Sequence, residues 1–136
     1  MDLIVLIGRV LFVLLFLNSA FGHFTKTEGM AGYAESKGVP SPRLATQASG
    51  AVQLVGALMV LLGVWADLGA LLLVLFLLPT AFVMHAFWKE SDPQAKQMGM
   101  TQFLKDVSLA GAALMFFGLY AGAGSELGLT VTGPLF

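Results

Sequence analysis

Apolar residues gather in four long stretches that short polar segments separate. The stretches cover residues 3–24, 44–65, 68–88 and 103–122. A helix needs about 20 apolar residues to cross the hydrocarbon core of a bilayer, and these stretches have about that length. The pattern therefore predicts an all-α, polytopic membrane protein, in which residues 1–136 form a single transmembrane domain that is a four-helix bundle.

The connections indicate how the predicted spans meet. The turn around Asp67 is so short that the second and third spans must be antiparallel neighbours, and Asp67 is expected to cap the third span at the interface. Longer connections cover residues 25–43, which can hold a short surface helix, and residues 89–102. Asp92 followed by Pro93 predicts a helix start well before the fourth span. That span is therefore expected to begin as a polar helix.

The distribution of charged residues predicts how the chain is oriented in the membrane. Charged residues make up 11% of the chain, against about 25% in soluble domains. Seven residues are Lys or Arg, and all except Arg9 lie in or beside the two longer connections. Positive residues in short loops stay in the cytoplasm. We therefore predict a multi-pass protein of the cell (plasma or inner) membrane with both connections inside and both termini outside. The bilayer is its expected partner, and nucleic acid is not.

An internal similarity suggests a duplication. Residues 8–21 read GRVLFVLLFLNSAF, and residues 69–82 read GALLLVLFLLPTAF. A histidine follows each copy, His23 after the first and His85 after the second. Because Leu, Ala and Phe dominate every membrane helix, chance similarity is the alternative. We favour two two-helix repeats related by an axis along the membrane normal.

Ionisable residues inside a membrane are costly and therefore informative. Arg9 lies within the first span. One interpretation is that it extends outward to the headgroups or pairs with Asp2 or Asp67. The other is that it is a fixed cation for an anionic headgroup or a quinone carbonyl. We favour the anchoring role. Lys105 and Asp106 are likewise expected to be interfacial anchors at the start of the fourth span.

The two histidines are the main candidates for a ligand site. His23 and His85 both lie at the predicted cytoplasmic ends of their spans, hence at one depth. Facing imidazoles could ligate haem iron, hold a metal or hydrogen-bond a quinone. Without a third ligand, a role in capping helix ends is favoured over haem or a metal site. Our hypothesis is a pocket in which the imidazoles hold a quinone headgroup. Four aromatic residues belong to this predicted ligand site. Phe24, Phe82 and Phe87 would pack the quinone ring, and Trp88 would lie beside the pocket.

In their order along the chain, several segments resemble the DoxX family of small membrane proteins. They are Arg9, Gly22–His23, Gly38–Val39–Pro40, Gly56, Phe76–Trp88, Asp92–Pro93, Phe103–Asp106 and Gly111. The family often has Lys–Asn where this chain has Lys105–Asp106, and many members have Lys near His23. The resemblance implies a four-helix membrane protein. It also implies a link to redox systems, because some relatives take part in quinone-linked thiosulfate oxidation or in oxidative-stress complexes.

Two classes of function follow. The first is a membrane subunit or scaffold of a quinone-linked redox complex, acting with partner subunits or as a homo-oligomer. The alternative is a module for lipid binding or small-solute transport without redox chemistry. A self-sufficient enzyme ranks third, because the sequence offers no nucleophile–base pair, no intramembrane carboxylate pair and no nucleotide-binding glycine motif. It identifies no catalytic residue. The chain has no cysteine, which excludes thiolate and Fe–S chemistry by its own side chains.

Overall fold

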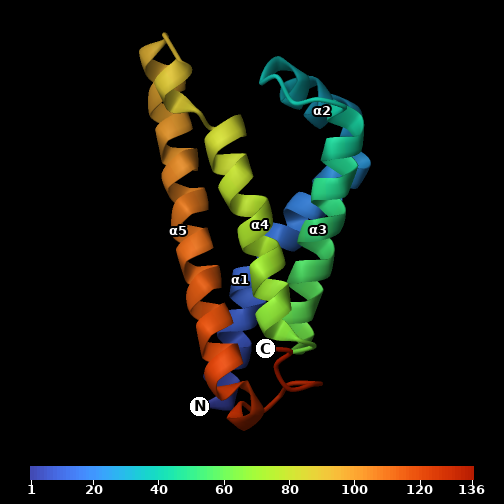
Figure 1. Ribbon diagram of the computed structural model, residues 1–136. Coiled ribbons are helices and arrows are strands. Elements are labelled where there is room, and N and C mark those ends of the chain that lie inside the picture. The colour runs from blue at the N-terminus through green and yellow to red at the C-terminus, as the bar shows by residue number, and fades with distance from the viewer.

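The computed structural model describes residues 1–136, and its regular secondary structure is entirely helical. Four helices are long and apolar enough to cross a membrane, so the predicted fold class is confirmed. The long helices are α1 (Asp2–Thr25), α3 (Pro42–Leu62), α4 (Ala66–Met84) and α5 (Pro93–Ala123). Three short helices are α2 (Thr27–Ser36) and the 3-10 turns η1 (Phe87–Lys89) and η2 (Gly124–Glu126). In Figure 1 both termini lie at one end of the bundle, and α2 lies at the other.

Local sequence signals explain where α5 begins. The Asp92 side chain accepts a hydrogen bond from the Ala95 backbone N–H at 2.8 Å, and Pro93 occupies the first turn. A carboxylate satisfies one of the free N–H groups at a helix start, and proline needs no donor there. The helix then continues without a break into the apolar stretch, as the sequence predicted.

The core lies where the four long helices meet. Its nine buried residues come from all four: Val13, Phe16, Ala57, Val60, Ala70, Leu73, Leu77, Ala110 and Ala113. Glycines bring α3 and α4 especially close. A Cβ atom at Gly69 would lie 2.7 Å from the Met59 Cβ, and one at Gly56 would lie 3.0 Å from the Gly69 carbonyl oxygen. Small residues drive helix packing in lipid because they let backbones approach. The second and third spans are thus the predicted close neighbours.

Arg9 is not at the surface. Its side chain is 1% exposed. The guanidinium donates to the carbonyl of Val60 at 2.9 Å, to that of Leu129 at 2.8 Å and to that of Leu61. The expected extension to the headgroups and the pairing with Asp2 or Asp67 are therefore both wrong. The physical reason is that the last carbonyls of a helix have no partner within it, and Arg9 lies beside the end of α3.

Asp67 does not have its expected role either. The residue that precedes α4 is Trp65, which has a positive φ of 43°, and no side chain caps the helix. Asp67 is fully buried, and its Oδ2 accepts the backbone N–H groups of Leu135 and Phe136, each at 2.8 Å. The chain after α5 folds back over this end of the bundle and supplies these donors. Asp67 is therefore an internal anchor for the tail and not an interfacial cap.

The two-helix repeat stays a prediction. α1 packs along α3, and α4 packs along α5, as two repeated hairpins would. Helices that are consecutive in an up-and-down bundle pack the same way without any duplication.

Candidate functional site

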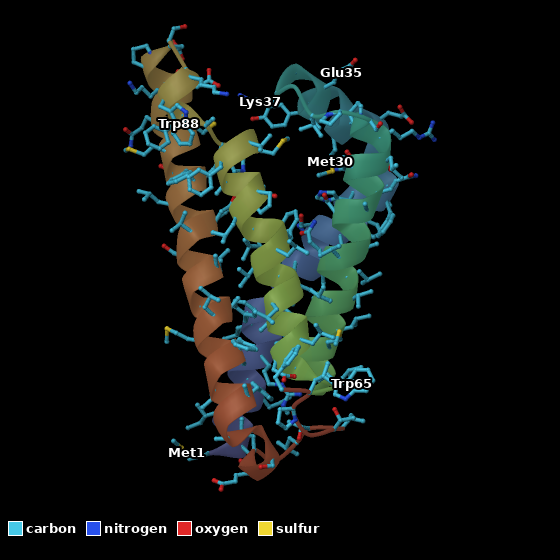
Figure 2. All side chains as sticks on the ribbon, viewed as in Figure 1. Met1, Met30, Glu35, Lys37, Trp65 and Trp88 are labelled. Atoms are coloured by element: carbon cyan, nitrogen blue, oxygen red, sulfur yellow. The ribbon has the colours of Figure 1, made fainter.

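A cavity of about 600 Å³ opens at the α2 end of the bundle. All five α-helices contribute to its 22 lining residues, of which half are hydrophobic. Met30 of α2, labelled in Figure 2, is one of the apolar residues, and Phe16, Phe76 and Leu77 are others. Pockets that bind small molecules have volumes of about 300–1,000 Å³ and combine apolar walls with a few polar groups. This cavity has both properties.

His23 and Gln53 form the first polar group of the lining. Ser19 and His23 lie one turn apart on α1, and His23 Nδ1 lies 2.8 Å from the Ser19 carbonyl oxygen. Gln53 reaches across from α3, with its Nε2 atom 3.4 Å from the Nε2 atom of His23. Gly50 makes this approach possible, since a Cβ atom there would lie 2.7 Å from the His23 Cβ. The Gln53 Oε1 atom is buried and has no hydrogen-bond partner.

His85 and Asp106 form the second polar group. His85 ends α4, and its Nε2 lies 3.5 Å from Oδ2 of Asp106 on α5. Asp106 is only 5% exposed, and Oδ2 makes no hydrogen bond. Asp106 is therefore a buried group of the cavity rather than the interfacial anchor that the sequence predicted, because its helix face is turned toward α4. Its neighbour Lys105 is exposed, reaches the cavity edge and donates to the Gln102 side chain.

The structure brings the two predicted histidines to one cavity but leaves the four predicted aromatic residues outside its lining. Phe82, Phe87 and Trp88 instead surround Phe103 of α5, with ring centroids 5.2, 5.5 and 5.6 Å from it. The chain turns after Met84, which carries Phe87 and Trp88 to the α5 side of α4, where the Trp88 ring meets that of Phe82. Phe24 is about half exposed. The rings that do line the cavity belong to Phe16, Tyr33 and Phe76.

Sequence reasoning did not assign Gln53 to the site. The available signal was the presence of a polar residue within an apolar span, because such residues are costly in lipid and usually have a functional or structural role. No three His, Asp or Glu side chains lie close enough together to hold a metal ion.

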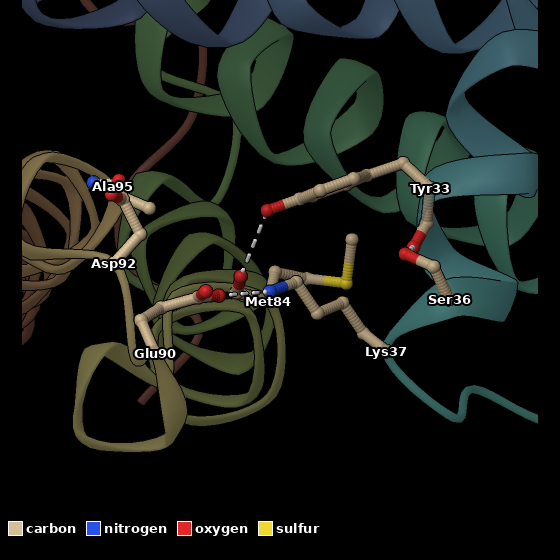
Figure 3. A network of polar contacts seen from close by, with 7 residues as sticks. All are labelled: Tyr33, Ser36, Lys37, Met84, Glu90, Asp92 and Ala95. Carbon is tan, nitrogen blue, oxygen red and sulfur yellow. Dashed lines mark hydrogen bonds and ion pairs between the residues drawn. The ribbon is translucent and has the colours of Figure 1, made fainter.

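Two contacts hold α2 against the end of α4 beside the cavity, as Figure 3 shows. Tyr33 donates its hydroxyl hydrogen to the Met84 carbonyl at 3.2 Å, and the Lys37 ammonium lies 2.8 Å from the Glu90 carboxylate. The hydrogen bond to Glu90 raises the pKa of Lys37 above its ordinary value of 10.5. Because Tyr33 and Met84 also line the cavity, α2 forms part of its wall.

Comparison with known proteins gives two consistent results. The family model described as DoxX matches residues 4–86. The inner membrane protein YphA of Escherichia coli (strain K12) is 30% identical over 131 residues, which are 96% of this chain and 84% of YphA. The inner membrane protein YqjF of the same organism is 28% identical over 133 residues, which are 98% of this chain and 86% of YqjF. No solved structure matches the chain significantly.

Proposed function

The chain belongs to the DoxX family of integral membrane proteins, and from this premise we propose that it is a membrane subunit or scaffold of a quinone-linked redox complex. In this proposal the cavity binds the quinone-type ligand. The observation that carries it is the composition of the cavity. Its volume is about 600 Å³, its walls include Phe16, Phe76 and Leu77, and its imidazole, amide and charged side chains lie in two groups, one around His23 and one around His85. A flat apolar ring with oxygen atoms at its ends suits such a lining.

The orientation in the membrane is part of the proposal. The two similar bacterial proteins are inner membrane proteins, and we assign this chain to the same membrane type. The Lys and Arg residues outside α1 flank the α2 end of the bundle. By the positive-inside rule this end, with its cavity, faces the cytoplasm and both termini face outward.

We assign binding to this chain and electron transfer to a partner subunit. The chain has no cysteine, so its side chains cannot hold an Fe–S cluster through thiolates. The hydroxyl groups of Thr46 and Thr80 line the cavity, but they donate to carbonyls of their own helices at 2.8 and 2.7 Å. Neither hydroxyl is paired with a histidine, as an activated nucleophile would be.

The test is purification of the protein in a mild detergent, followed by solvent extraction and mass spectrometry of bound quinones and phospholipids. Decylubiquinone is then titrated into the protein in lipid nanodiscs. Gln53→Leu removes both polar atoms of a cavity side chain, and we expect it to weaken binding by about tenfold. Gln47→Leu is the matched control, because Gln47 is exposed on the same helix and outside the lining. Equal affinity in the two variants and the parent would contradict the proposal.

A lipid-binding module is the second candidate function. Lys105 lines the cavity, and its ammonium group could pair with the phosphate of an anionic headgroup. The same extraction distinguishes the two functions. If the protein retains stoichiometric phospholipid and neither retains nor binds quinone, this second function replaces the first.

A further inference from the structure

The polar atoms that the cavity leaves without partners are acceptors of hydrogen bonds. Gln53 Oε1 and Asp106 Oδ2 are both buried and make no hydrogen bond, in residues that are 0% and 5% exposed. The nearest ionisable group to Asp106 Oδ2 is His85, whose Nε2 atom lies 3.5 Å away, too far for a good hydrogen bond. Both residues line the cavity. A buried acceptor without a donor is costly, and most such groups in folded proteins are paired. These two atoms therefore indicate that a bound ligand would supply hydrogen-bond donors.

The orientation of the Gln53 amide follows from its neighbours. Its nitrogen donates to the Ser49 carbonyl at 3.4 Å, and a carbonyl can only accept. The nitrogen must therefore face Ser49, and the oxygen is the atom left unpaired.

The His23 ring adds no donor to the cavity. Its Nδ1 atom lies 2.8 Å from the Ser19 carbonyl oxygen, so in the neutral ring this nitrogen carries the hydrogen. The Nε2 atom then has a lone pair and no hydrogen. The Gln53 amide nitrogen lies 3.4 Å from both ring nitrogens, so in this tautomer the His23 ring supplies no N–H group to the cavity.

The charges around the cavity favour an uncharged donor. Asp106 is the one carboxylate in the lining, and Lys105 beside it is a cation in the same lining. An ammonium ligand would meet Asp106 but also the positive charge of Lys105. A hydroxyl group donates without that repulsion.

We propose that the cavity selects the reduced, hydroxyl-bearing form of its ligand, a hydroquinone whose O–H groups donate to Gln53 Oε1 and Asp106 Oδ2. This inference rests on the proposed function, since it specifies the redox form of the same quinone-type ligand. The oxidised ring has carbonyl oxygens only and leaves both protein atoms unpaired. The hydroquinone pairs both of them.

The test compares three tail-free probes with the same methylated ring: duroquinol, duroquinone and the dimethyl ether of duroquinol. Each is titrated anaerobically into the protein in nanodiscs by isothermal calorimetry. We expect duroquinol to bind at least about tenfold more tightly than the other two, because only duroquinol donates hydrogen bonds. Equal affinity for all three would overturn the selectivity and leave the proposed function standing. Failure of all three to bind would contradict the proposed function itself.

Two variants test the atoms that are named. Gln53→Met keeps the side-chain length but removes the acceptor, and it should weaken duroquinol binding by more than it weakens duroquinone binding, so that the preference for duroquinol becomes smaller. Asp106→Asn keeps the shape of the side chain and introduces an N–H donor. It should therefore raise the affinity for duroquinone and reduce the preference for duroquinol over duroquinone. This variant tests the assignment even if Gln53→Met fails to fold. Gln47→Met is the matched control and should keep the parental preference. If both site variants fold by circular dichroism and keep the parental preference, the assignment is wrong.

Discussion

Arg9 of α1 donates its Nε hydrogen to the carbonyl of Val60 on α3, 2.9 Å away. The same guanidinium also donates to Leu61 near the end of α3 and to Leu129 in the tail. One buried cation thus joins three segments of the chain. Its planar guanidinium group supplies hydrogen-bond donors to carbonyl groups at the end of α3, which have no donor within their own helix.

We expect Arg9→Met to destabilise the protein by about 3 kcal/mol or more. Hydrogen bonds from a charged group contribute about 1.5–3 kcal/mol each, and their loss leaves carbonyls buried and unpaired. Thermal or denaturant unfolding in detergent measures the change. Arg43→Met is the control, since Arg43 is mostly exposed and pairs at 3.3 Å only with an exposed Glu28. Equal stability of the two variants would contradict this role of Arg9.

Asp67 should hold the tail in place. Its carboxylate accepts the N–H groups of Leu135 and Phe136, so Asp67→Ala removes both bonds. Hydrogen–deuterium exchange of residues 127–136 should then become faster, while exchange in the core of α4 stays slow. Glu126→Gln, which changes an exposed carboxylate of η2, should leave the exchange unchanged. A tail that is equally protected in Asp67→Ala would show that other contacts hold it.

The glycines of the bundle should differ in their tolerance of alanine. A Cβ atom at Gly69 would meet Met59 at 2.7 Å, whereas one at Gly118 would meet nothing within 4 Å. Overpacking costs about 1–3 kcal/mol, and we expect a loss of this size for Gly69→Ala. Gly118→Ala should be neutral or stabilising by up to about 1 kcal/mol, because alanine favours the helix. Unfolding curves of the two variants compare them directly, and a larger loss at Gly118 would be inconsistent with this packing.

The contact between Lys37 and Glu90 should restrain α2. The ammonium and the carboxylate are partly exposed, and such pairs contribute about 0.2–1 kcal/mol. Glu90→Gln should therefore raise hydrogen exchange in residues 27–36 modestly. Glu35→Gln is the control, because Glu35 is exposed on α2 and belongs to none of the ion pairs.

The pH dependence of this contact follows from the raised pKa of Lys37. A lysine whose folded-state pKa is raised stabilises the folded state fully below its unfolded pKa, and the effect is lost as the pH rises through the folded value. The contact should thus persist at neutral pH and weaken only above about pH 10.5. Lower protection of residues 27–36 already at pH 8, after correction for the faster intrinsic exchange of amides at higher pH, would contradict it.

Topology can be tested by cysteine labelling, because the chain has no cysteine of its own. We expect Ser125→Cys, at an exposed position after α5, to react with a membrane-impermeant maleimide in intact cells and Lys96→Cys to react only after the membrane is opened. The reason is the concentration of Lys and Arg at the α2 end of the bundle. Labelling of position 96 from outside would reverse the orientation and place the cavity on the outer side.

The sequence by itself determined the fold class, the four helices long enough to span the membrane and the start of α5 at Pro93. These features follow from local properties. In lipid the backbone must satisfy its own hydrogen bonds, so a run of apolar residues of sufficient length becomes a helix. The capping by Asp92 is equally local, since its partner Ala95 is three residues away.

Only the tertiary structure decided which groups the polar residues meet. Arg9 finds partners 51, 52 and 120 residues further along the chain. Gln53 pairs with a histidine from another helix, and Phe87 and Trp88 turn to α5 because the chain bends after Met84. A polar group buried in lipid must find some partner. The sequence offers several possible hydrogen-bond partners for each buried polar side chain. Only the packing of the helices determines which of these partners comes within reach.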